Sequence, residues 1–389
     1  MRQKKWFPFF LAACLFILAS VFSPSAYSQM PQRQPTPNDT LKSPQVLSDH
    51  RVKISIYAPK ASEVTVSGDF PGGSPSMKLE KGEIGVWSVT IGPLKPDYYT
   101  YTLTVDGVRT MDPKNPVIKQ GINSLENMMA VSGQETAFQD NKSVPHGEVR
   151  QVWYQSTSLD MPRRMHVYTP PGYEKSNTKY PVFYLLHGGG DDDSGWSTVG
   201  RANFILDNLL AAGKAKPMIV VMPNGSMPIR STPGAMNPQA MTQMRTMFAD
   251  ELLKEVMPYV EKNYRILTGR ENQAIAGLSM GGFQTLDVTL SHGDLFNYVG
   301  VFSSGFFGPS IDEAETKYAK VLQDPNFNKS KKLFWVEIGK DDFVMEANKK
   351  TLALLDKHQI KYQYKETEGG HTWINWRQYL NEFAPLLFR

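Results

Sequence analysis

The chain has 389 residues, of which 41% are hydrophobic and 21% charged, which is typical of a folded globular protein long enough for two domains. A net charge of only +4 gives no reason to expect nucleic acid or an anionic membrane surface as a partner. The single cysteine excludes an intrachain disulfide and a cysteine-rich metal site.

Residues 1–28 have the layout of a secretory signal peptide. Three basic residues precede an apolar stretch over residues 6–22, and small residues lead to a cleavage site expected after Ser28. The apolar stretch is short for a bilayer span, so we expect no integral span in the mature chain, with a retained anchor as the alternative. The residues before Cys14 resemble a bacterial lipobox, which leaves lipoprotein anchoring as a minor alternative. The expected location is therefore the periplasm or the outside of the cell.

Residues 29–131 predict a leader followed by a small all-β domain. Residues 29–45 are rich in Pro, Gln and Thr and lack apolar periodicity, as in a flexible leader. From residue 46 to residue 131, apolar and polar side chains alternate in short runs separated by Gly- and Pro-containing turns. This pattern predicts an antiparallel, immunoglobulin-like β-sandwich. The clearest expected strands are residues 52–56, 64–66, 87–91 and 99–105.

The pattern changes after a polar linker, residues 132–146. Over residues 147–389, short apolar runs alternate with segments of helical periodicity, which predicts an α/β domain with a mostly parallel sheet covered on both faces. The expected strands are residues 180–186, 218–222, 273–276, 298–302, 333–338 and 362–366, and the expected helices are residues 202–212, 246–264 and 346–358.

The sequence Gly277-Leu-Ser279-Met-Gly281 lies between an expected strand and an expected helix. In the G-x-S-x-G motif of α/β-hydrolases, the serine occupies a strained strand-to-helix turn, and the flanking glycines let backbone pass close by. The N-terminus of the following helix favours developing negative charge. The motif alone is only moderately specific, so the prediction of Ser279 as a nucleophile depends on its partners.

A serine nucleophile needs a base, and His371 is the best candidate. Hydrolases of this type place the acid and then the histidine after the serine. Three histidines follow Ser279, and His292 and His358 lie near the ends of expected helices, where we expect solvated surface side chains. His371 lies in a glycine-containing loop directly after the last expected strand, where a base can reach over the sheet edge.

The orienting acid is expected after the strand at residues 333–338. Two adjacent carboxylates, Asp341 and Asp342, follow that strand and lie between the serine and the histidine in the chain. The G-x-x-D arrangement favours Asp342, with Asp341 as the alternative.

An oxyanion hole completes the expected machinery. One donor is the backbone N–H of Met280, the residue after the nucleophile. The second is expected from His187-Gly-Gly-Gly190, where Gly189 is favoured and Gly188 is the alternative, because glycine lets an N–H approach the substrate oxygen. His187 is expected to be a structural residue of this loop.

These motifs together resemble the esterase D-like enzymes of carbohydrate esterase family 1, particularly bacterial feruloyl esterases. The resemblance covers nearly all of residues 147–389, and the segment before it resembles early-set domains related to carbohydrate-binding module family 48. Trp87 is the only tryptophan of that domain and is expected in its core. The esterase resemblance rests on Tyr184-Leu-Leu-His-Gly, Trp196, Gly200-Arg-Ala-Asn203, residues 216–224, residues 276–282 and Gly369-Gly-His371.

The resemblance implies a Ser-His-Asp esterase that removes ferulate or acetate from feruloylated or acetylated xylan or xylo-oligosaccharides through an acyl-enzyme, without a metal or organic cofactor. Trp373 and Trp376, together with Trp196, are candidates for substrate contact, although at their spacing one of the first two is equally compatible with a core position. Residues 225–243 lack periodicity and predict a loop that either borders the site or has no role.

Four alternative functions stay open. Within the enzymes these are an acetylxylan esterase, a siderophore-ester hydrolase and an acyltransferase of the mycolyl type. Outside them, the chain would be a non-catalytic polysaccharide-binding protein on a hydrolase scaffold.

Overall fold

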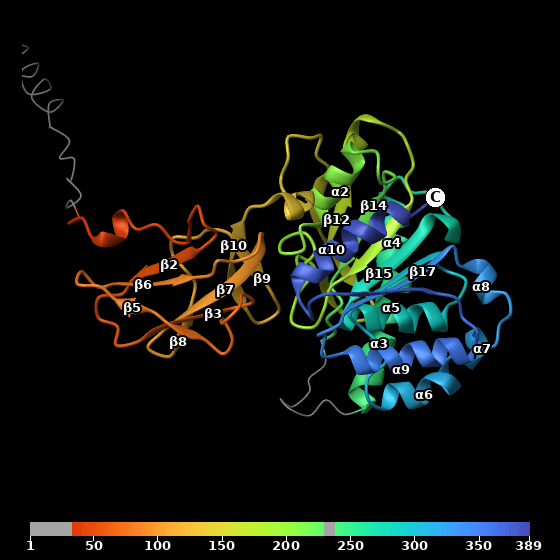
Figure 1. The fold of residues 1–389 in the computed structure, drawn as a ribbon. Helices are drawn as coiled ribbons and strands as arrows, with labels where there is room; N and C mark the ends of the chain where they lie inside the picture. Colours follow the sequence, from red (N-terminus) through yellow and green to blue (C-terminus); the bar gives the residue numbers. More distant parts are fainter. Residues whose placement is uncertain (1–32, 229–237) are drawn as a thin grey trace, which may run out of the picture. The chain divides into compact units, whose positions relative to one another are not determined.

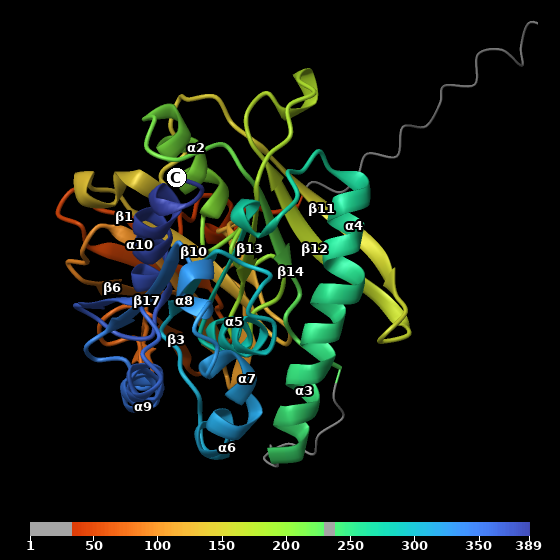
Figure 2. The same ribbon diagram turned by 90° about the vertical axis from the view of Figure 1, so that its right-hand side faces the viewer.

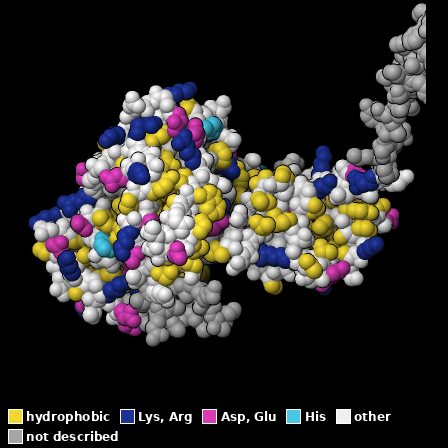
Figure 3. All heavy atoms as spheres, turned by 180° about the vertical axis from the view of Figure 1, so that it is seen from behind, with side chains coloured by type: hydrophobic (Ala, Val, Ile, Leu, Met, Phe, Trp, Pro, Cys, Tyr) yellow, Lys and Arg dark blue, Asp and Glu magenta, His cyan; other side chains and the backbone are white. Residues whose placement is uncertain are grey.

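The computed structural model describes residues 33–228 and 238–389 (Figure 1). Residues 41–389 form one compact unit, and the described part of residues 1–40 carries a 3-10 helix, Pro37–Asp39. The expected signal peptide, with its cleavage site after Ser28 and with Cys14, lies outside the described residues. No helix within the described ranges is long and apolar enough to cross a membrane. On the face in Figure 3, basic and acidic side chains are interspersed, as the low net charge leads one to expect.

The all-β domain consists of two antiparallel sheets. One has the order β1-β2-β6-β5, and the other has the order β4-β3-β7-β10-β9 with β8 paired to β7. Val52, Ile54 and Ile56 alternate into the core between them, and Trp87 is only 7% exposed in the same core, as predicted. The strands are β1 (Gln45–Val46), β2 (Val52–Tyr57), β3 (Val64–Gly68), β4 (Met77–Lys78), β5 (Glu80–Lys81), β6 (Val86–Ile91), β7 (Asp97–Val105), β8 (Val108–Thr110), β9 (Ile118–Gln120) and β10 (Leu125–Val131).

The α/β domain is built on one sheet of eight strands in the order β11-β12-β14-β13-β15-β16-β17-β18. The pairs from β14-β13 to β17-β18 are parallel, whereas β11-β12 and β12-β14 are antiparallel. The carboxyl ends of β13, β15, β16, β17 and β18 therefore share one edge, where ligands bind in such sheets. The strands are β11 (Glu148–Ser156), β12 (Met161–Thr169), β13 (Val182–Leu186), β14 (Ile219–Pro223), β15 (Gln273–Leu278), β16 (Tyr298–Phe302), β17 (Leu333–Gly339) and β18 (Gln363–Thr367).

Helices cover both faces of this sheet, and alternate residues of one strand belong to different cores. Tyr184 and Leu186 of β13 pack in a core with α3, α5 and α9, whereas Phe183 and Leu185 pack in a second core with α2 and α10. A continuous apolar run is thus explained by a strand buried on both sides. The helices are α2 (Ala202–Ala211), α3 (Pro238–Glu251), α4 (Met257–Asn263), α5 (Met280–Ser291), α6 (Pro309–Lys317), α7 (Ala319–Leu322), α8 (Phe327–Ser330), α9 (Met345–Lys357) and α10 (Trp373–Phe383).

The structure corrects two features of the predicted α/β domain. The long antiparallel hairpin β11-β12 was not among the expected strands, because its outer strand leaves Trp153 and Val149 exposed and lacks a continuous apolar run. The expected loop over residues 225–243 contains the start of α3 at Pro238, while residues 229–237 lie outside the described residues. Figure 2 shows that α3 continues into α4 as one long helical column, joined by a π-helical turn, Leu252–Val256.

Arg377 of α10 links the two domains. Its side chain is fully buried, and Nη2 donates to Asp97 Oδ1 at 2.7 Å and to the Tyr98 carbonyl at 2.9 Å, both in β7. Nη1 donates to the Val199 carbonyl at 2.8 Å, and Gln139 Nε2 also donates to Asp97. A buried charge of this kind is tolerated only when it is paired and hydrogen-bonded, so the junction is an integral part of the fold.

Candidate active site

Ser279 lies at a strained turn between β15 and α5. Its φ of 52° and ψ of −116° are unusual for a residue with a side chain and lie in a region that costs on the order of 1–3 kcal/mol. The flanking glycines allow the turn: a Cβ on Gly277 would lie 2.4 Å from the Gly281 backbone, and one on Gly281 would lie 2.6 Å from the His187 carbonyl. The strand-turn-helix context predicted for the motif is thus present.

His371 and Asp342 are brought together by the loops after β18 and β17. His371 Nδ1 lies 2.9 Å from Asp342 Oδ1 and 3.1 Å from Oδ2. The Asp342 carboxylate is buried and also accepts the Val344 N–H, whereas Asp341 is exposed. Burial alone would raise the pKa of Asp342, but the hydrogen bonds from His371 and Val344 outweigh it and hold the pKa below its usual value. Asp342 therefore stays ionised and fixes a proton on Nδ1.

The other two candidate histidines have different surroundings. His292 is exposed at the end of α5. His358 Nε2 lies 3.2 Å from Glu315 Oε1 at the end of α9, outside the loops that carry Asp342 and His371.

Aromatic rings surround the His371 imidazole. Trp376 meets it edge to face at 4.9 Å between ring centres, and the 79% exposed Phe343 lies 4.4 Å away. Trp373 and Trp196 stack behind Trp376 in the same edge-to-face manner. The three tryptophans are between 0% and 6% exposed, so they form a packed wall behind the histidine and offer no open stacking surface to a substrate.

The loop after β13 carries the expected oxyanion donor. Gly189 lines the same cavity as Ser279 and Met280, and a Cβ on Gly188 would lie 3.4 Å from Ser279 Cβ. His187 Nε2 accepts the Gly225 N–H at 2.8 Å, so Nδ1 carries the proton and donates to the Gly188 carbonyl at 2.8 Å. Both ring nitrogens thus bind backbone, in agreement with the predicted structural role of His187.

A cavity of about 350 Å³ opens beside Ser279. Apart from the glycine, the serine and Met280, its wall consists of Met244 and Arg245 from α3, Phe283 and Gln284 from α5, and Phe307. Sequence reasoning did not find these residues. The side chains of Phe283 and Gln284 follow the motif by one turn of α5, which was the available signal, but Phe307 and the start of α3 have no motif of their own.

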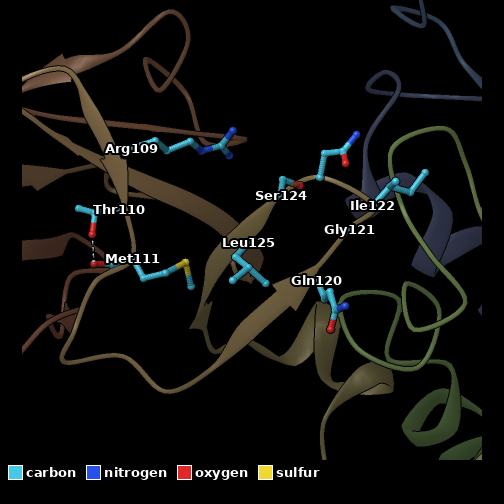
Figure 4. A pocket seen from close by; sticks show the side chains of 9 residues that line it. Arg109, Thr110, Met111, Gln120, Gly121, Ile122, Ser124 and Leu125 are labelled. Carbon is cyan, nitrogen blue, oxygen red and sulfur yellow. Dashed lines mark hydrogen bonds between the residues drawn. The ribbon is translucent and has the colours of Figure 1, made fainter. Parts of the chain in front are cut away.

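A larger hollow of about 530 Å³ lies in the all-β domain. It is bounded by β8 and by the hairpin β9-β10, and Figure 4 shows Arg109 and Thr110 across from Gln120 and Leu125. None of the predicted catalytic residues lines it.

Family models match both domains. Residues 156–387 match the family described as "Putative esterase", which is more than half of the chain. Residues 42–117 match carbohydrate-binding module 48, also described as the isoamylase N-terminal domain.

Individual relatives match either most of the chain or about two thirds of it. The chain is 32% identical over 362 residues to an endo-1,4-β-xylanase/feruloyl esterase of Xylanibacter ruminicola, which covers 89% of this chain but only 46% of that protein. The chain thus spans less than half the length of this curated relative. A CE1 ferulic acid esterase from Anaeromyces mucronatus, solved with ferulic acid, is 27% identical with a TM-score of 0.56, over 64% of this chain and 93% of that one.

The enterobactin esterase of Shigella flexneri has a TM-score of 0.64 and covers 86% of this chain and 92% of that chain, at 17% identity; a likeness at this identity shows the fold alone. The chain has a serine at a strained strand-to-helix turn, a paired histidine and aspartate, and a family match over nearly the whole α/β domain. It therefore belongs to the family described as "Putative esterase" and carries a carbohydrate-binding module 48 domain before its esterase domain.

Proposed function

We propose that the protein is an exported serine esterase that releases ferulate, or a related aromatic acyl group, from xylan side chains. The observation that carries this proposal is the apolar cavity beside Ser279, at the sheet edge where Asp342 holds His371. The relatives named for feruloyl esterase activity support the substrate class.

In the proposed reaction, Ser279 Oγ attacks the ester carbonyl carbon while His371 takes the hydroxyl proton. The N–H groups of Met280 and Gly189 stabilise the oxyanion, a contribution worth on the order of 3 kcal/mol per donor. The intermediate collapses to an acyl-enzyme as the ester C–O bond breaks, and His371 gives its proton to the departing sugar oxygen, which leaves as a hydroxyl. A water molecule, deprotonated by His371, then releases the acid and restores Ser279.

The cavity favours an aromatic acyl group over acetate. Its volume of about 350 Å³ lies in the range of small-molecule pockets, and an acetyl group would leave most of it unfilled. The rings of Phe283 and Phe307 supply apolar contact, while Arg245 and Gln284 add polar groups to the wall. We assign the acyl group to this cavity and place no substrate contact on the buried tryptophans.

A siderophore ester, which also carries an aromatic acid, is the second candidate. The likeness to an enterobactin esterase extends over most of the chain but is limited to the fold. The module 48 match and the xylanase-linked relative favour the polysaccharide ester.

The test is turnover by wild type and Ser279→Ala on methyl ferulate, feruloylated arabinoxylan fragments, acetylated xylan and a catecholate siderophore ester. We expect wild type to release ferulate and the variant to lose at least 10⁴-fold in kcat. Release of acetate alone would overturn the aromatic assignment and keep the mechanism. Equal activity of both proteins would overturn the mechanism, and hydrolysis of the siderophore ester alone would overturn the xylan assignment.

A further inference from the structure

The turn of the β9-β10 hairpin, residues 121–124, reaches from the all-β domain to the loop after β13. The Ile122 N–H donates to the Gly190 carbonyl at 3.0 Å, and Gly121 pairs with Asp191 in an isolated antiparallel bridge. Lys119 Nζ lies 2.9 Å from Asp191 Oδ1, and both side chains are largely buried. In Figure 4, Gly121 and Ile122 lie on the side of the hairpin that faces the green ribbon of the catalytic domain.

The contacted segment is the turn that carries the proposed oxyanion donor. The Asp191 N–H points back to the Gly188 carbonyl at 3.4 Å, which leaves Gly189 and Gly190 as the two central residues. Two consecutive glycines have wide conformational freedom, and Gly190 takes a φ of +86°. Contacts from outside must therefore fix this turn.

The turn is held at both ends. At its start, the protonated Nδ1 of His187 donates to the Gly188 carbonyl, which belongs to the same planar peptide unit as the Gly189 N–H. Because carbonyl and N–H of a trans peptide point in opposite directions, this bond sets the direction of the Gly189 N–H. At its end, the hairpin of the other domain holds the Gly190 carbonyl and the Asp191 side chain.

We infer that the β9-β10 hairpin positions the oxyanion donor, so that the all-β domain contributes to the chemical step itself. This inference rests on the proposed function, because it needs Ser279 as the nucleophile. The geometry leaves little room for other arrangements: a Cβ on Gly121 would lie 2.4 Å from the Gly190 carbonyl oxygen. The hairpin contacts Gly190 and Asp191, the two residues that follow Gly189, and acts on the donor through them.

The closing experiment compares Ile122→Pro, which removes the donated N–H, with Ile122→Ala, which keeps it. Asn123→Ala, in the exposed part of the same turn, is the second control. The substrate is methyl ferulate, and kcat is expressed per active site titrated by an acylation burst, so that a misfolded fraction does not count. We expect kcat of Ile122→Pro to fall about tenfold, less than the loss on deleting a donor, with KM within twofold, and both controls to keep the wild-type kcat.

A second readout separates positioning from general destabilisation. An aryl boronic acid forms a covalent tetrahedral adduct on the serine and places an oxygen in the oxyanion hole, whereas the product ferulate forms no such adduct. For Ile122→Pro, the inhibition constant of the boronic acid should rise in parallel with the loss of kcat, and that of ferulate should stay unchanged. Gly121→Ala, whose added methyl pushes on Gly190, should give the same signature.

The inference is overturned if Ile122→Pro and Gly121→Ala keep the wild-type kcat per titrated site, or if Ile122→Ala loses as much as Ile122→Pro. It is also overturned if only KM changes. The proposed function fails separately, through an inactive wild type or an active Ser279→Ala in the same assay.

Discussion

Each domain contains a buried aspartate that accepts several hydrogen bonds, and their surroundings differ. Asp112 of the all-β domain accepts from Ser43 Oγ at 2.6 Å and from Tyr101 Oη at 2.7 Å, and all three residues are at most 6% exposed. Asp342 instead holds His371, whose side chain remains 16% exposed. A hydrogen-bond network whose partners are all buried serves stability, whereas one that ends on a partly exposed imidazole can move a proton.

The largest effect should come from Asp342→Asn. The amide cannot hold the Nδ1 proton of His371 in the same way, so kcat should fall on the order of 10⁴-fold while the fold is retained. The matched control is Asp341→Asn at the exposed neighbour, which should change kcat less than threefold. Steady-state kinetics on methyl ferulate together with thermal melting measure both; a larger loss in the Asp341 variant would contradict the assignment of the acid.

Asp112→Asn should lower the stability of the protein and leave kcat unchanged, which is the opposite of the result expected for Asp342→Asn. The carboxylate accepts the Ser43 and Tyr101 hydroxyls at Oδ2 and the Lys114 N–H at Oδ1. The NH₂ group of an asparagine would replace one of these two oxygens, so the donors on that side would lose their acceptor. We expect a loss of about 2–3 kcal/mol in the free energy of unfolding, with kcat per folded molecule unchanged. Denaturant titration measures the stability. A fall in kcat without a loss of stability would contradict the assignment of Asp112 to stability and of Asp342 to catalysis.

A third buried carboxylate, Glu337 of β17, predicts a pH dependence of stability. Burial raises its pKa to about 7, although Trp335 Nε1 donates to it and Lys365 lies near. In the unfolded chain it ionises near its ordinary pKa, so the folded state loses stability as the pH rises from about 4.5 to about 7.

Glu337→Gln should therefore stabilise the protein above pH 7 by about 1–3 kcal/mol and have no such effect at pH 4. Melting curves of the variant and wild type across this range test the sign. A stability difference that is independent of pH would contradict the raised pKa.

The smallest effect concerns the acyl group. Phe307→Ala removes part of the apolar wall beside Ser279, and we expect kcat/KM for methyl ferulate to fall about tenfold, since losing such contact costs roughly 1–2 kcal/mol. The kcat/KM for 4-nitrophenyl acetate should change less than twofold. Equal losses on both substrates would mean that the cavity does not hold the aromatic group. The buried Trp373 offers no such selective variant, because its truncation would disturb the core.

The sequence motifs coincide with a strained turn at Ser279 and with a hydrogen-bonded pair of His371 and Asp342, because chemistry constrains local sequence. A nucleophile at Ser279 needs glycines two residues before and after it, and His371 and Asp342 each follow a strand end, so motif and chain order were enough to predict these three candidates. The cavity wall was not found, because Met244, Phe283 and Phe307 are apolar residues whose role depends on which side of a helix or loop faces the serine. The three tryptophans near the motifs show the opposite error. They were candidates for substrate contact because they lie close to the motifs in the sequence, but the sequence did not show that their side chains are buried: Trp196, Trp373 and Trp376.

The residues that make the contact between the domains could not be identified from the sequence. Ile122 acts through its backbone N–H, which every residue except proline carries, and Arg377 is indistinguishable in sequence from the solvated arginines of other helices. Their roles follow only from which segments the fold brings together.

The most direct test of the central claim is covalent labelling with an alkyl fluorophosphonate, followed by intact-mass and peptide mass spectrometry. We predict one adduct per chain, located on Ser279, with labelling at least 100-fold slower in Asp342→Asn. Labelling at another residue, or full esterase activity in a protein that the reagent does not modify, would contradict the assignment of Ser279 as the nucleophile.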